Sequence, residues 1–116
     1  MSASRRAILL AVALLGVAGS LAGCGGTDAR RVSHITRGQG YLAEGNLEKA
    51  RIEFANALQI SPNNAEARYL MGQVAERLGD LRTAAAMYQG VIEIDPADIE
   101  ARVSLARLYV FSRTPE

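Results

Sequence analysis

Apolar residues recur at helical spacing through most of the chain after residue 31, and short polar segments interrupt them. Glycine accepts left-handed turn conformations, and proline cannot continue a helix because it lacks a backbone N–H. The interrupting segments contain Gly45-Asn46, Pro62-Asn63-Asn64, Gly79-Asp80 and Pro96-Ala97-Asp98. The pattern therefore predicts an all-α fold with five helices, over about 32–44, 47–60, 65–78, 81–94 and 98–111.

The same punctuation recurs every 34 residues. When the sequence is shifted by that interval, glycines meet glycines and turn prolines meet turn prolines. The identical pairs are Gly38/Gly72, Gln39/Gln73, Gly45/Gly79, Leu47/Leu81, Ala50/Ala84, Ile60/Ile94 and Pro62/Pro96. Phe54 meets another aromatic residue, Tyr88. A fixed period of this length indicates stacked copies of one supersecondary unit, which makes a non-repeating helical bundle the weaker interpretation.

These positions resemble the tetratricopeptide repeat (TPR), a 34-residue pair of antiparallel helices. The resemblance places repeat 1 at 31–64, repeat 2 at 65–98, and the first helix of a truncated repeat 3 at 99–116. It implies an α-solenoid of about two and a half repeats. The chain departs from the family at the fourth position, where Trp is replaced by His34, Arg68 and Arg102.

Small residues and aromatics have distinct expected roles in each repeat. Gly38 and Gly72 on the first helices are expected, with Ala50 and Ala84 on the second helices, to let paired backbones approach closely. The aromatics are expected to fill the space between one hairpin and the next. Asn63 is expected to cap the following helix, with Glu66 completing a capping box.

The last predicted helix is apolar on more faces than repeat 2 can cover. Its apolar residues are Val103, Leu105, Leu108, Tyr109, Val110 and Phe111. We expect part of this surface to be exposed, because a terminal repeat usually ends in a polar helix. The sequence is consistent with the N-terminal part of a longer array or a truncated reading frame, and alternatively with a last helix that packs on another chain.

The N-terminus predicts an export signal. Arg5 and Arg6 precede the apolar segment 7–21, which is shorter than the roughly 20 residues needed to span a bilayer. Leu21-Ala22-Gly23-Cys24 resembles the lipobox of bacterial lipoproteins. The resemblance implies a signal peptide over 1–23, lipidation of Cys24 and a flexible linker over 24–30. The alternatives are an ordinary signal peptide or a short membrane helix.

By the same resemblance, Gly25 in place of Asp after the lipidated cysteine indicates the outer membrane, facing the periplasm. The expected location is therefore the bacterial cell envelope, with the protein held to the membrane by its N-terminal lipid.

The first helices of TPR arrays line a concave groove, so the resemblance also implies a binding surface. The candidate protein-binding residues are Ile35, Gln39, Leu42, Tyr69, Gln73, Glu76, Val103 and Arg107. The alternative is that these residues are only solvated or lie between repeats. Family members that hold a peptide's C-terminal carboxylate use Lys, Asn and Arg, whereas the matching positions here are Ile35, Gln39, Leu70, Glu100 and Ser104. We therefore do not expect a receptor for chaperone tails.

Composition and motifs exclude several other functions. The chain has 13 Lys and Arg against 12 Asp and Glu, so no basic surface for nucleic acid is expected. One Cys and one His cannot complete a Cys/His zinc site. His34 has no catalytic partner at a meaningful spacing, and no nucleophile or phosphate-binding motif is present. We expect no enzymatic activity, no cofactor, no metal site and no small-molecule substrate.

The sequence thus predicts a non-enzymatic, membrane-anchored scaffold or adaptor for protein or peptide partners in the periplasm. Residues 52–72 most resemble the TPR lipoproteins of exopolysaccharide and PEP-CTERM-type export systems. One alternative is a pilotin-like TPR lipoprotein for assembly of the type IV pilus secretin. Another is the adaptor segment of a longer protein with an enzymatic domain beyond residue 116.

Overall fold

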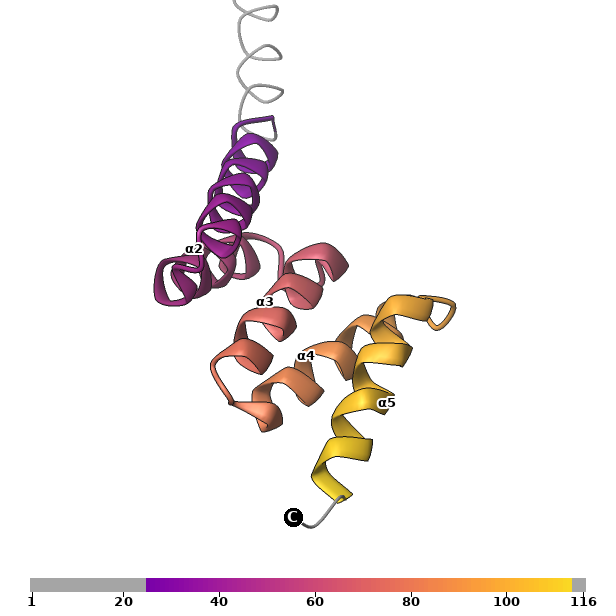
Figure 1. Cartoon of the computed structure of the whole chain (residues 1–116). Helices are drawn as coiled ribbons and strands as arrows, with labels where there is room; N and C mark the ends of the chain where they lie inside the picture. Colours follow the sequence, from indigo (N-terminus) through magenta and orange to yellow (C-terminus); the bar gives the residue numbers. More distant parts are fainter. Residues whose placement is uncertain (1–24, 114–116) are drawn as a thin grey trace, which may run out of the picture. The chain divides into compact units, whose positions relative to one another are not determined.

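The computed structural model describes residues 25–113, and all regular structure among them is helical (Figure 1). The chain divides into two compact units, 1–30 and 31–116. In the second unit, helix 31–43 is followed by α2 (Leu47–Ile60), α3 (Ala65–Arg77), α4 (Leu81–Ile94) and α5 (Ile99–Arg113). The bounds of α2 to α5 agree with the predicted helices to within two residues, and the first helix ends at 43 against a predicted 44, but residues 25–30, before its predicted start at about 32, are helical as well. The predicted all-α TPR architecture is confirmed.

One glycine follows the first helix of each hairpin. Gly45 and Gly79 have φ of 79° and 80°, the left-handed region that residues with a Cβ rarely adopt. The next residue caps the second helix: the Asn46 side chain accepts from the Lys49 N–H at 3.3 Å, and Asp80 accepts from the Thr83 N–H at 3.1 Å. In each turn between paired helices, a left-handed glycine is therefore followed directly by the N-cap residue of the second helix.

The turn between the two repeats differs from the prediction by one residue. Asn64, not Asn63, caps α3, and its side chain accepts from the Ala67 N–H at 2.8 Å. Asn63 instead accepts from Nη2 of Arg68 at 3.2 Å, and Nε of Arg68 donates to the Pro62 carbonyl at 2.9 Å. The Arg68 guanidinium reaches this turn from α3 and engages the Asn63 side chain. Asn64 therefore caps the helix in place of Asn63.

The close approach within each hairpin is between a glycine and an aromatic ring. A Cβ added to Gly72 would lie 2.6 Å from Cε1 of Tyr88, and one added to Gly38 would overlap the Phe54 ring. Phe54 and Tyr88 are fully buried. The expectation that these glycines only bring backbones together is therefore incomplete, because their missing side chains make room for the rings.

The core of the second unit is built from successive layers along the stack. Phe54 and Ala50 pack with Met71 and Val74 of α3, and Tyr88 and Ala84 pack with Leu105 and Leu108 of α5. Each aromatic therefore also reaches the next repeat, as predicted. Helix α3 packs between α2 and α4, and α4 packs on α5.

The outer surface of α5 is apolar, as the sequence predicts. Ile99, Val103, Tyr109 and Phe111 are each more than half exposed, whereas Leu105 and Leu108 are buried against α4. Because the same helix turns apolar side chains both inward and outward, its exposed face is available for further packing.

Two predictions concern the N-terminal unit. Residues 25–30 are helical, so the prediction of a flexible linker over 24–30 is wrong for them. Residues 27–30 contain neither Pro nor Gly, which allows a helix even after two glycines. The predicted signal peptide and Cys24 lie outside the described residues. Among residues 25–113, no helix is both long enough and apolar enough to span a membrane.

Candidate docking groove

One hollow is formed jointly by the first helices of all three repeats. Its volume is about 340 Å³, and helix 31–43, α3 and α5 contribute its lining. The lining residues are Leu42, Gln73, Glu76, Arg77 and Arg107. Four of these five are candidate groove residues from the sequence. The spacing of first-helix positions therefore brings Leu42, Gln73, Glu76 and Arg107 together, although 65 residues of sequence separate the outermost two.

Glu76 is the most connected side chain of the hollow. Its Oε1 accepts from Nη2 and Nε of Arg107 at 2.9 and 3.2 Å. Its Oε2 accepts from the Tyr88 hydroxyl at 2.8 Å and from Nη2 of Arg107 at 3.1 Å. Three helices, α3, α4 and α5, thereby converge on one carboxylate.

Tyr88 connects the groove to the core. Its ring is fully buried, while its hydroxyl reaches Glu76 at the surface of the hollow. Burial raises the pKa of Tyr88 well above its usual range, and the hydrogen bond and negative charge of Glu76 raise it further. The phenol therefore stays protonated and acts as a donor that fixes the carboxylate.

The remaining polar groups of the hollow are less committed. Nη1 of Arg77 donates to the carbonyl of Leu42 at 3.0 Å, as a second donor beside the Gly45 N–H at 3.1 Å, at the C-terminal end of helix 31–43. Within the described part of the chain, the Gln73 amide has no hydrogen-bond partner. The groove thus combines a fixed ion pair with donors that a ligand can use.

Three other candidate residues lie outside the hollow, each in a different environment. Tyr69 is half-buried and its ring lies 5.5 Å from that of Tyr88, tilted by 47°. Gln39 is exposed and donates to Oε1 of Glu66 at 3.4 Å, a contact between the first two repeats. Val103 on α5 is 56% exposed. None of the three lines the hollow.

Ile35 is a correction to the predicted groove. It is only 5% exposed and packs with Ala57 of α2 and Ala67 of α3. Two small alanines on the neighbouring helices leave a space that this side chain fills, so it stabilises the contact between repeats and cannot meet a ligand. Ser104, another position matched to carboxylate-binding members, is also buried.

Arg77 is the groove residue that sequence reasoning missed. It follows Glu76 directly and lies in the last turn of α3, where a basic residue is favourable for the helix dipole. Its role depends on the end of helix 31–43 lying within reach of its guanidinium. A search for basic residues next to the predicted groove positions would have found it.

The described residues offer little else that resembles a reactive site. Nδ1 of His34 lies 2.6 Å from Oε2 of Glu53. The same oxygen accepts a hydrogen bond from Nε of Arg37 at 3.3 Å. This cluster joins helix 31–43 to α2 and contains no Ser, Thr or Cys side chain. Among residues 25–113, no group of three or more His, Cys, Asp or Glu side chains could hold a metal ion.

Comparison with known protein families supports the repeat assignment. A family described as "TPR repeat" matches residues 38–79, and one described as "Tetratricopeptide repeat" matches residues 65–98. Together they extend over 38–98, just over half of the chain. The first TPR of Spaghetti (RPAP3), solved with the HSP90 peptide SRMEEVD, superposes with a TM-score of 0.70 over 72% of this chain and 67% of that one. At 20% identity, this likeness concerns the fold.

Curated relatives include proteins of different function. The type IV pilus assembly protein PilF of Pseudomonas aeruginosa is 34% identical over 81 residues, which is 70% of this chain and 27% of that protein. A putative cytochrome c-type biogenesis protein CcmH of Haemophilus influenzae is 31% identical over 64 residues, 52% of this chain and 14% of that protein. The chain therefore spans about a quarter or less of these relatives. From its 34-residue period, its stacked hairpins and these matches, the chain belongs to the tetratricopeptide-repeat proteins.

Proposed function

We propose that the protein is a non-enzymatic scaffold that binds protein or peptide partners in the groove of its first helices. The observation that carries this proposal is the hollow to which all three repeats contribute. A surface built from three successive repeats can follow an extended peptide or a helix, whereas no single helix offers such a site.

Tyr69 and Leu42 suit this role because they place an aromatic and an aliphatic side chain on the same face as several hydrogen-bonding groups. Tyrosine is enriched among the residues that dominate binding energy at interfaces. The solved TPR neighbour carries a bound peptide, which supports a peptide as the kind of partner.

The test of the groove is capture of partners with matched variants. Tyr69→Ala and Gln73→Ala in the full chain are expected to reduce recovery of partners from solubilised envelopes. Gln89→Ala, on the exposed surface of α4, serves as the control because Gln89 does not line the hollow. Identical recovery with all three variants would contradict the groove as the binding surface.

We also propose that a lipid on Cys24 holds the scaffold in the cell envelope, at the periplasmic face of the outer membrane. The support is the Leu21-Ala22-Gly23-Cys24 motif behind a short apolar segment. Confinement to one membrane raises the effective concentration of partners that share it. Two or three acyl chains anchor a protein firmly, because each buried CH₂ contributes about 0.8 kcal/mol.

Cys24→Ser is expected to abolish lipidation and release the protein from the membrane fraction or leave it uncleaved. The reason is that only a thiol accepts the diacylglyceryl group in this pathway. Fractionation and intact-mass measurement of the full chain in a diderm host provide the readout, and Ser20→Ala serves as the control. Unchanged membrane association, with no lipid mass on the wild type, would contradict the anchor.

Two envelope systems are candidates for the scaffold's place of action. Similarity of residues 52–72 to TPR lipoproteins favours an exopolysaccharide or PEP-CTERM-type export system. The match to PilF favours assembly of the type IV pilus. A deletion strain separates them: loss of secretin multimers supports the pilus role, and loss of exported polysaccharide or sorted proteins supports the export role.

A further inference from the structure

We propose that the hollow lined by Leu42, Gln73, Glu76, Arg77 and Arg107 is an acid-accepting subsite, which binds the side-chain carboxylate of an Asp or Glu in the partner. This inference rests on the proposed docking function and names the chemistry that the groove selects. It depends on which donors and acceptors of the hollow are already used.

Glu76 is the one carboxylate among the described residues that line the hollow, and its hydrogen-bonding capacity is already used. Both oxygens of Glu76 accept hydrogen bonds, from the Tyr88 hydroxyl and from two nitrogens of Arg107. Glu76 is 25% exposed at its side chain and its partners hold it in place. A basic ligand would therefore have to displace Arg107 or break the bond to Tyr88, so Glu76 is a poor acceptor for a new partner.

The donors of the hollow exceed its acceptors. Arg107 uses Nε and Nη2 on Glu76, which leaves Nη1 for a ligand. Arg77 uses only Nη1, on the Leu42 carbonyl, which leaves Nε and Nη2. The Gln73 amide adds a further donor. Two guanidinium groups face one carboxylate, so the local charge is positive and the unmet groups are N–H donors.

A carboxylate is the ligand that this arrangement fits. Arginine binds carboxylates through paired, charge-assisted hydrogen bonds, and the partly enclosed hollow screens them less than open water does. Leu42 supplies an apolar wall beside these donors. The expected motif in a partner is therefore an acidic residue next to an aliphatic or aromatic one.

The charges along the groove indicate where the acidic residue of a partner binds. Glu66 and Glu100 lie in the first turns of α3 and α5, whereas Arg77 lies in the last turn of α3. The acidic residue of a partner is therefore expected near the C-terminal end of α3, away from Glu66 and Glu100. A side-chain carboxylate, rather than a peptide's C-terminus, is favoured because Ile35 and Ser104 are buried where terminal-carboxylate binders need polar groups.

The test begins with selection of random 12-residue displayed peptides on the full chain, purified in detergent. Selected peptides are expected to be enriched in Asp or Glu beside an apolar residue. Synthetic versions are then made with an amidated C-terminus, and the acidic residue is replaced by its amide. This replacement is expected to weaken binding about tenfold or more, the range for loss of a charge-assisted hydrogen bond.

Protein variants identify the donors. Arg77→Gln is expected to weaken binding of the acidic peptide by a similar factor and to have little effect on binding of the amide peptide. The reason is that the protein variant and the amide replacement remove the same contact. Arg77→Gln leaves the Glu76–Arg107 pair intact. Arg102→Gln is the charge-matched control, since Arg102 is an exposed arginine of α5 outside the hollow, and it should leave both affinities unchanged.

The outcomes separate this inference from the function on which it rests. Peptides that need Tyr69 or Gln73 but show no acidic preference would overturn the acid-accepting subsite and leave the docking function standing. Loss of binding on amidation of the C-terminus alone would overturn it in favour of a terminal carboxylate. Peptides whose binding ignores Leu42, Tyr69, Gln73 and Arg77 would overturn both proposals.

Discussion

Repeats 1 and 2 share their helix ends and their glycine–aromatic contacts, but they differ at the groove. At the twelfth and twenty-fourth positions, repeat 1 has Leu42 and Phe54, and repeat 2 has Glu76 and Tyr88. Leu42 packs against the cluster that contains Phe54, whereas Glu76 accepts a hydrogen bond from Tyr88. An apolar pair in one repeat is thus replaced by a hydrogen-bonded pair in the next.

This difference shows how a repeat changes the side chains of its groove without changing its fold. The buried part of each aromatic fills the same space above a glycine, so the scaffold is preserved. Only the hydroxyl of Tyr88 extends beyond that space, and it requires an acceptor at the groove. The two positions therefore change together, because a buried hydroxyl without Glu76 would lack its partner.

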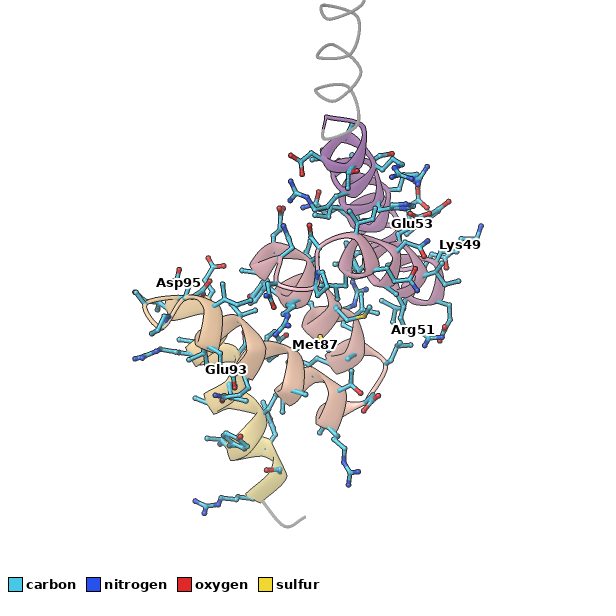
Figure 2. All side chains as sticks on the ribbon, turned by 180° about the vertical axis from the view of Figure 1, so that it is seen from behind. Lys49, Arg51, Glu53, Met87, Glu93 and Asp95 are labelled. Atoms are coloured by element: carbon cyan, nitrogen blue, oxygen red, sulfur yellow. The ribbon has the colours of Figure 1, made fainter. Side chains whose placement is uncertain are left out.

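A second difference lies where the first helix of each repeat meets its second helix. Repeat 1 has the ion-pair cluster of His34, Arg37 and Glu53. The equivalent residues of repeat 2 are Arg68, Met71 and Met87. Figure 2 shows Glu53 on α2 and Met87 on α4. The contact between the two helices of repeat 1 therefore includes ion pairs at a place where repeat 2 has two methionines. The third equivalent residue, Arg68, instead reaches the turn before α3.

The largest expected effect tests the feature that the repeats share. Gly72→Ala is expected to destabilise the protein by roughly 1–3 kcal/mol, because the new Cβ would lie 2.6 Å from the buried Tyr88 ring. Gly38→Ala should have a similar cost against Phe54. Gly40→Ala is the control: no atom lies within 4 Å of its added Cβ, so the helix should gain about 0.5–1 kcal/mol. Denaturant unfolding measures all three, and equal stabilities would contradict the shared ring contact.

The next effect tests the difference between the two aromatics. Phe54→Tyr is expected to cost about 1–2 kcal/mol, because its hydroxyl would face Leu42 without an acceptor. Adding Leu42→Glu should recover part of that loss by recreating the pair of repeat 2. The reverse change, Tyr88→Phe, should cost about 0.5–1.5 kcal/mol through loss of the bond to Glu76. A double-mutant cycle measures the coupling, and strictly additive energies would show that positions twelve and twenty-four act independently.

The smallest effect concerns pH and should come from repeat 1. Hydrogen bonding to His34 holds the pKa of Glu53 below its ordinary value of 4.5; burial opposes this shift, and the charge of Arg37 adds to it. A lowered pKa in the folded state stabilises the protein above the ordinary value, and this stabilisation is lost as the pH falls through the folded-state value.

The measurement is the difference in unfolding free energy between the wild type and Glu53→Gln, followed from neutral pH to below 4.5. The difference should shrink on acidification. Met87→Leu, at the equivalent position of repeat 2, should show no such trend. A pH-independent difference for Glu53→Gln would place the acid sensitivity of the protein elsewhere.

Much of the fold follows from local residues. Gly45 and Gly79 determine where helices end, Asn46 and Asp80 cap the helices that follow, and the 34-residue spacing of these signals predicts the stacking of hairpins. The resemblance to TPR arrays implies four of the five residues that line the hollow. Local rules were less reliable at the Asn63-Asn64 turn, because Arg68 reaches it from the next helix.

The sequence by itself determined the repeat unit, the helix ends and the face on which a groove forms, because these depend on backbone conformation and on residues a few positions apart. Only the tertiary structure decided that Ile35 belongs to the core, that Arg77 lines the hollow and that Tyr88 holds Glu76. Those outcomes depend on the distance between side chains of different helices. That distance is set by how small residues such as Gly72, Ala57 and Ala67 let the helices pack.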